Sequence, residues 1–203
     1  MKLNKYFPFL LSFIVFIVSC GTYTLKPPKV ETIAQESTVT IVENNVAICK
    51  AVSISPWLLV TAAHCGNQTI KYVEPDSNYT PMNAHAVITD SVNDVSIYQT
   101  ETPRDHWVPL QQWSQPHDGD NVLAGGSWST IKTTHWVGRS EEHGTLRLGI
   151  QVDTQAPKGH SGSALIDEYG VLIGICSGHE TQTWQGIYVP SSIIISLLKA
   201  THK

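Results

Sequence analysis

The chain has little charge and no basic excess. Only 15% of its 203 residues are charged, with 17 acidic against 13 basic side chains and a formal net charge of −4. A protein that binds nucleic acid through its phosphates carries a basic surface, so the composition speaks against nucleic acid as a partner. Low charge together with six tryptophans also excludes a disordered chain. The length favours one domain or two small lobes that share one cleft.

Long apolar runs are missing except at the N-terminus. Lys2 and Lys5 precede an almost wholly apolar stretch at residues 7–18. A bilayer span takes about 20 residues, so this shorter stretch is typical of a signal peptide over residues 1–19. Phenylalanine is also missing after residue 16. The core of the remaining chain must therefore rest on Val, Ile, Leu, Trp and Tyr, which favour strands.

The end of this segment, Ile17-Val18-Ser19-Cys20-Gly21, resembles the bacterial lipobox. The resemblance implies that Cys20 becomes a lipid-modified N-terminus, which would attach the exported protein to the cell or outer membrane, facing the envelope or the exterior. An ordinary secretory signal that happens to contain a cysteine remains the alternative. Residues 20–37 contain few large apolar side chains and are expected to form a tether.

Short apolar segments separated by turn residues make up the rest of the chain. This pattern favours an all-β barrel or sandwich, and a run of turn signals at residues 112–120 divides it into two halves of similar size. We expect two β-barrels at about residues 38–114 and 115–190, followed by a helix at residues 191–199 that Ser191 or Ser192 can cap. The tryptophans are expected to pack in the core.

Three segments contain the residue types that acyl transfer needs, in the order His64, Asp94 and Ser161. Serine is a weak nucleophile at neutral pH, so a neighbouring imidazole has to accept its proton. A carboxylate holds that imidazole in the useful tautomer and stabilises its charged form. Gly159 and Gly162 flank the serine, permit a tight turn and let backbone N–H groups converge on an oxyanion.

The segments Val60-Thr-Ala-Ala-His-Cys65, Asn93-Asp-Val-Ser-Ile97 and Gly159-His-Ser-Gly-Ser163 resemble the three signature blocks of chymotrypsin-like serine proteases. The resemblance spans residues 38–199 and implies two six-stranded antiparallel barrels with a C-terminal helix. It also implies roles for the residues of the site: His64 as general base, Asp94 as its orienting carboxylate, Ser161 as nucleophile, the N–H groups of Gly159 and Ser161 as the oxyanion hole, and a disulfide between Cys49 and Cys65. The implied partner is a protein or peptide substrate, with no metal and no cofactor.

Departures from the family limit what can be said about specificity. The resemblance places the substrate pocket at Gln155, Ala156, Cys176, Ser177 and Gly178. Neither an acidic residue, as for cleavage after Lys or Arg, nor the histidine and threonine of glutamyl endopeptidases stands at these positions. His160 replaces the aspartate that precedes the serine in digestive enzymes, and it is expected, with His179, near the cleft. Cys176 is expected to be a buried free thiol.

Several alternatives stay open at this point. Asp90 is the rival of Asp94, which is favoured by the preceding Asn93 and by the alternating strand that follows it. The nine histidines include no H-E-x-x-H pattern, so a metalloprotease is not supported. An esterase with the same triad would need a second glycine where Ser163 stands. A catalytically latent lipoprotein that uses the protease fold as a binding module is the main alternative function.

Overall fold

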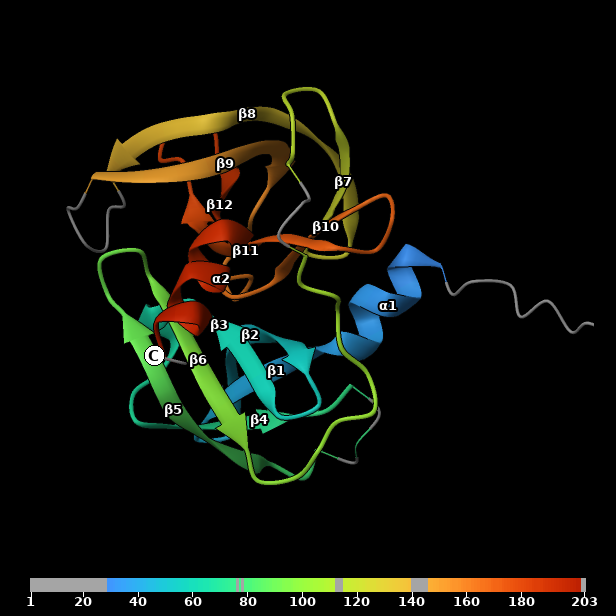
Figure 1. The fold of residues 1–203 in the computed structure, drawn as a ribbon, viewed down its shortest axis with the longest axis vertical. Coiled ribbons are helices and arrows are strands. Elements are labelled where there is room, and N and C mark those ends of the chain that lie inside the picture. Colours follow the sequence, from blue (N-terminus) through green and yellow to red (C-terminus); the bar gives the residue numbers. More distant parts are fainter. Residues whose placement is uncertain (1–28, 76, 78, 112–114, 140–145, 202–203) are drawn as a thin grey trace, which may run out of the picture.

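A computed structural model of the chain describes residues 29–75, 77, 79–111, 115–139 and 146–201. The predicted signal peptide and the predicted lipidation site at Cys20 lie outside these residues. Within the described part, the strands close into two six-stranded antiparallel barrels, one above the other in Figure 1. The prediction of fold class is therefore confirmed.

The first barrel has the closed order β1-β2-β3-β6-β5-β4. Its strands are β1 (Thr38–Glu43), β2 (Val46–Ser55), β3 (Leu58–Thr61), β4 (Thr69–Val73), β5 (Met82–Asp90) and β6 (Val95–Thr100). The second barrel has the closed order β10-β11-β12-β9-β8-β7. Its strands are β7 (Asn121–Ala124), β8 (Ser127–Arg139), β9 (Leu146–Gln155), β10 (Ala164–Asp167), β11 (Leu172–His179) and β12 (Gln185–Pro190).

Tyrosine takes the place of phenylalanine in the interior. Tyr72 and Tyr98 are fully buried among the aliphatic side chains of the first barrel, and Tyr188 is buried in the second. The tryptophan expectation is wrong for Trp57, Trp107, Trp128 and Trp184, which all stay nearly half exposed.

A third apolar cluster lies between the barrels and holds them together. It joins side chains of β2, β3 and β6 from the first barrel with side chains of β7, β10, β11 and β12 from the second. Ile194 of the C-terminal helix α2 (Ser191–Ala200) and Ala34 of the N-terminal helix α1 (Val30–Ser37) also belong to it. The two barrels thus share one core at their interface, which fixes the groups that each contributes to the cleft between them.

Two helices flank this interface (Figure 1). The α2 helix covers Ser191–Ala200, as the sequence predicts, but its N-cap is Pro190 with no side-chain cap. The α1 helix covers Val30–Ser37, so the last part of the expected tether is helical, and Ala34 and Ser37 are buried. Neither of these described helices has the length and apolarity needed to cross a membrane.

Candidate active site

The pairing of β3 with β6 brings His64 and Asp94 together. Thr61, the last residue of β3, lies opposite Ser96 near the start of β6. His64 lies in the short 3-10 helix Ala63–Cys65 that follows β3, and Asp94 immediately precedes β6. The Ala63 N–H donates to the Asp94 carbonyl at 3.1 Å, which ties the two loop ends together. Antiparallel pairing therefore makes neighbours of two residues that are 30 positions apart in the sequence.

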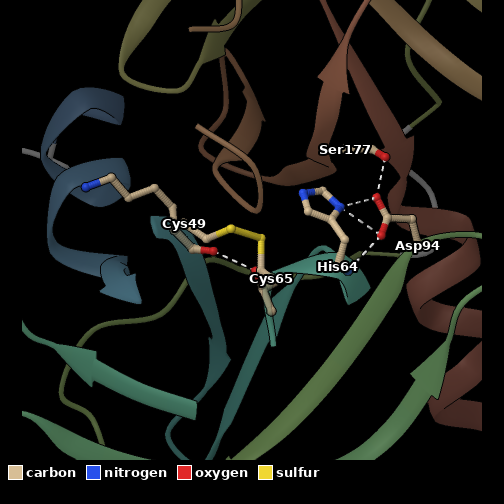
Figure 2. Close-up of a disulfide and its surroundings, with 7 residues drawn as sticks. Cys49, His64, Cys65, Asp94 and Ser177 are labelled. Atoms are coloured by element: carbon tan, nitrogen blue, oxygen red, sulfur yellow. Dashed lines mark hydrogen bonds and ion pairs between the residues drawn. A yellow bond between two sulfur atoms is a disulfide. The ribbon is translucent and has the colours of Figure 1, made fainter. Parts of the chain in front are cut away.

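The Asp94 carboxylate is buried and holds His64 in several ways. Nδ1 of His64 lies 3.1 Å and 3.0 Å from the two carboxylate oxygens, and the His64 backbone N–H donates to Oδ1 at 3.0 Å. The Ser177 hydroxyl donates to Oδ2 from β11 (Figure 2). Burial alone would raise the pKa of Asp94, but the hydrogen bonds and charge of His64, with the Ser177 hydroxyl, outweigh it and lower that pKa to about 2. The carboxylate is thus ionised whenever the protein is folded near neutral pH.

The rival carboxylate, Asp90, has a different place. Its Oδ1 accepts the backbone N–H groups of Val92 and Asn93 at 3.0 Å, and its Oδ2 accepts the Asn93 amide at 2.7 Å. Asp90 therefore closes the turn between β5 and β6. That turn leaves Asp94 with a φ of +58°, a left-handed conformation that aspartate tolerates better than most residues. The structure brings Asp94, and not Asp90, to His64.

Ser161 lies on a loop that both barrels hold. Its carbonyl accepts the backbone N–H of Lys50 from β2 at 2.8 Å. On the other side, the Gly162 N–H donates to the Cys176 carbonyl of β11 at 2.7 Å, and the Cys176 N–H donates to the Ser163 carbonyl at 2.8 Å. These bonds fix the backbone on either side of the serine, so its hydroxyl is presented from a rigid support.

Glycine is required at position 162. The residue has a φ of +81°, and a Cβ there would lie 2.0 Å from the Lys50 carbonyl oxygen and 2.2 Å from Thr61 Oγ1. Gly159 also has a positive φ, +85°, and begins the turn that carries the serine. Within the described chain, the amides of Gly159 and Ser161 donate to no backbone carbonyl, whereas the His160 amide between them donates to the Pro157 carbonyl. Two N–H groups are thereby left available beside the serine, as an oxyanion hole needs.

His64 and Ser161 line the same cleft, whose volume is about 450 Å³. Four of the five predicted pocket residues line it too: Ala156, Cys176, Ser177 and Gly178. Gln155 is the exception, because it ends β9 opposite Gln185 and is exposed there. Sequence reasoning missed part of the lining, namely Ile48, Pro157 and Lys158.

Of the two histidines expected near the cleft, only His179 lines it. His179 lines it and stacks on Trp184 with ring centroids 4.3 Å apart. His160 lines a different cavity of about 470 Å³, which also includes Lys50 and residues of α1. Burial lowers the pKa of His160, and the charge of Lys50 lowers it further. The His160 side chain therefore lines a cavity separate from the one that His64 and Ser161 share.

Three cysteines have the bonding states that the sequence predicts. Cys49 and Cys65 form a disulfide with a Cα–Cα distance of 5.9 Å, and both line the cleft beside His64. Cys176 is a free, buried cysteine. Burial raises the pKa of its thiol to about 12, which makes it a poor nucleophile. Cys176 is therefore unsuited to act as a nucleophile in this cleft.

Comparison with known proteins agrees with this geometry. Residues 48–175 match the family model of the trypsin-like peptidase domain. No curated protein matches the chain. The active form of the Rv3671c protease from M. tuberculosis is similar, with a TM-score of 0.68 and 19% identity, covering 84% of this chain and 82% of that chain. The MamO protease domain from Magnetospirillum magneticum has a TM-score of 0.68 and 14% identity, covering 81% and 96%. These identities are low, so the likeness to solved structures shows the fold, which is that of the chymotrypsin-like proteases.

Proposed function

The chain belongs to the family of trypsin-like peptidase domains, and we propose on that basis that it is a lipid-anchored serine endopeptidase of the cell envelope. The observation that carries the proposal is the shared cleft, in which an Asp94-bound His64 and the glycine-flanked Ser161 both lie. Acyl transfer needs a nucleophile, a base and a group that orients the base, and these three residues supply them.

In the proposed reaction, Ser161 Oγ attacks the carbonyl carbon of the scissile peptide bond while His64 Nε2 takes the hydroxyl proton. The amides of Gly159 and Ser161 donate to the oxyanion that forms, and each such donor is worth roughly 3 kcal/mol in related sites. The C–N bond then breaks and His64 gives its proton to the departing amine. Water repeats the sequence on the acyl-enzyme and restores Ser161.

The substrate is proposed to lie along β11 as an extra strand. Ser177 and Gly178 are at the cleft end of that strand, so their backbone groups are placed to pair with an extended peptide. Among the described residues that line the cleft there is no aspartate or glutamate, and Lys158 is the one formally charged side chain. We therefore expect poor cleavage after lysine or arginine, because nothing in this lining would neutralise a buried cation.

The test is covalent labelling of the full-length chain with a fluorophosphonate, which reacts with an activated serine. We expect labelling of the wild-type protein and none of Ser161→Ala or His64→Ala. Ser163→Ala is the matched control, since that buried serine lies two positions away and does not line the cleft that holds His64 and Ser161. A folded wild-type protein that is not labelled would contradict the proposal and favour the latent binding module.

Lipid attachment at Cys20 is the second part of the proposal. It is supported by the sequence pattern at residues 17–21 and by the apolar run before it. Mass spectrometry of the N-terminal peptide should find Cys20 as the first residue, carrying acyl chains. Cys20→Ala should move the protein from the detergent phase to the aqueous phase on phase separation. An unmodified Cys20 within a processed aqueous protein would instead show an ordinary secretory signal.

A further inference from the structure

The disulfide lies directly beside the imidazole of His64. One ligand atom of Cys49, one of Cys65 and one of His64 all lie within 4.8 Å of one another. Figure 2 shows the imidazole between the disulfide and Asp94. Two sulfurs and an imidazole at this spacing are the donor set of a zinc site, except that the sulfurs are bonded to each other.

His64 is already oriented in the way that a metal ligand would be. Its Nδ1 is held by Asp94 at 3.0 Å, which fixes the ring and leaves the lone pair on Nε2. Zinc-binding histidines in proteins commonly have this same carboxylate on the far ring nitrogen. The arrangement that prepares His64 to accept a proton from Ser161 thus also prepares it to bind a cation.

We propose that reduction of the Cys49–Cys65 disulfide creates a Zn²⁺ site made of both thiolates and His64 Nε2. Typical Zn–S and Zn–N bonds of about 2.3 Å and 2.0 Å place the sulfurs of a tetrahedral site about 3.8 Å apart. Sulfurs freed from their bond have to separate, and the imidazole has to approach them by up to about 1.3 Å. With three protein ligands, a tetrahedral Zn²⁺ would take water as its fourth ligand.

The step balances with a small thiol reductant, for which the cleft is the route to the sulfurs: both cysteines line it, although they are only 6% and 3% exposed. Two thiols of the reductant lose two electrons and form their own disulfide, and the S–S bond becomes two cysteine thiols. Zn²⁺ then binds both sulfurs and Nε2 and displaces two thiol protons to solvent. In the oxidised protein the sulfurs have no thiolate to offer, so the site does not exist.

The consequence for activity rests on the proposed function. The lone pair of Nε2 cannot bind Zn²⁺ and take the Ser161 proton at the same time. A reduced, zinc-loaded protein would therefore have a formed cleft and an unactivated serine. Exchange with a small-molecule disulfide, which takes up the two electrons and two protons and becomes two thiols, would re-form the Cys49–Cys65 bond, release the metal and restore the base. The state of one disulfide would then decide whether zinc silences the enzyme.

Metal binding is tested without reference to activity, on the full-length Ser161→Ala protein with Co²⁺ in place of Zn²⁺. After reduction we expect a single Co²⁺ per chain, with the thiolate-to-cobalt absorption and the intense visible bands of a tetrahedral site. The oxidised protein should show neither. Reduced Cys49→Ser/Cys65→Ser is the matched control, because it also lacks the disulfide but keeps Cys20 and Cys176. Asp94→Asn should weaken Co²⁺ binding by roughly ten-fold or more.

Several results would contradict the proposed metal site. Cobalt bands that persist in the double serine variant, that need no reduction, or that fail to appear in the reduced protein would each overturn the site. Loss of near-ultraviolet circular dichroism on reduction would overturn it too, because an unfolded chain holds no such site. With active protein, micromolar Zn²⁺ should block fluorophosphonate labelling only after reduction, and a chelator should restore it. If no form of the protein is labelled, the proposed function fails while the cobalt result still decides the metal site.

Discussion

The Ser177 hydroxyl donates to Oδ2 of Asp94 at 2.5 Å, across the interface between the barrels. Asp94 belongs to the first barrel and holds His64, whereas Ser177 belongs to β11 of the second barrel, which also borders the cleft. The carboxylate that orients the imidazole is therefore itself positioned by the barrel that carries Ser161. The placement of His64 therefore depends in part on the assembly of the two barrels.

Replacing Ser177 with alanine should lower labelling of Ser161 without abolishing it. The change removes one hydrogen bond to a buried charge, worth about 1.5–3 kcal/mol, and leaves the Asp94–His64 pair in place. We expect a roughly ten-fold lower labelling rate. Ser53→Ala is the matched control, since Ser53 is buried in the first barrel and its hydroxyl donates to the Ser55 carbonyl, away from Asp94. Equal rates for the two variants would show that Ser177 does not position Asp94.

Acid should destabilise the fold in a range set by Asp94. Its pKa is about 2 in the folded protein and close to the ordinary 3.8 in the unfolded chain. The stabilisation is therefore complete above about pH 4 and is lost as the pH falls from 3.8 toward 2. A difference of this size corresponds to roughly 2 kcal/mol. Urea unfolding gives the difference in the free energy of unfolding between wild type and Asp94→Asn. This difference should be smaller at pH 2 than at pH 7 by that amount. A difference that is constant with pH would refute the lowered pKa.

Two glycines with positive φ should respond very differently to alanine. Gly162→Ala places a Cβ against the Lys50 carbonyl and Thr61, so it should cost about 3 kcal/mol or more and abolish labelling. Gly126 has a φ of +94° but nothing within 4 Å of its Cβ position, so Gly126→Ala should cost only about 1 kcal/mol of backbone strain and leave labelling unchanged. If both variants lose a similar amount of stability in thermal unfolding, backbone strain and not the contact of the new Cβ causes the loss.

The sequence predicts the parts of this site that lie in short, contiguous segments. Turn residues and apolar alternation mark most strands, and the three segments around His64, Asp94 and Ser161 carry their chemistry locally. The choice of Asp94 over Asp90 agrees with the turn, in which Asn93 bonds back to Asp90. The disulfide also follows from a resemblance that is local to the histidine loop, and it is confirmed.

The missed features depend on contacts between distant segments. The strand β4 alternates polar and apolar residues, but its pairing with β1 and β5, which closes the first barrel, depends on contacts that its own sequence does not show. The long strand β8 is marked only weakly, because much of its sequence is polar. The hydroxyl of Ser177 becomes significant only once β11 approaches Asp94. The α1 helix has few large apolar side chains, and a buried arginine far along the chain binds its C-terminal end.

That arginine, Arg104, ties α1 to the first barrel. Its side chain is 3% exposed and bonds to both carboxylate oxygens of Glu74. It also donates to the Ser37 and Glu36 carbonyls, at 3.0 Å and 3.1 Å. A helix leaves its last carbonyls without partners, and a cation there satisfies them and opposes the helix dipole. The Ser37 and Thr38 hydroxyls donate to carbonyls of the preceding turn, and Arg104 satisfies the last two carbonyls of α1.

Arg104→Met should detach α1 before it unfolds the barrels. The variant keeps the apolar stem, loses the bonds to both carbonyls and strands the Glu74 carboxylate, so we expect a loss of about 3 kcal/mol in the free energy of unfolding. Hydrogen exchange should rise first in residues 30–37. Lys71→Met, at an exposed lysine of β4, is the control and should stay within about 0.5 kcal/mol of wild type. If exchange in α1 stays as slow as in the barrel strands, apolar contacts through Ala34, and not the arginine, hold this helix in place.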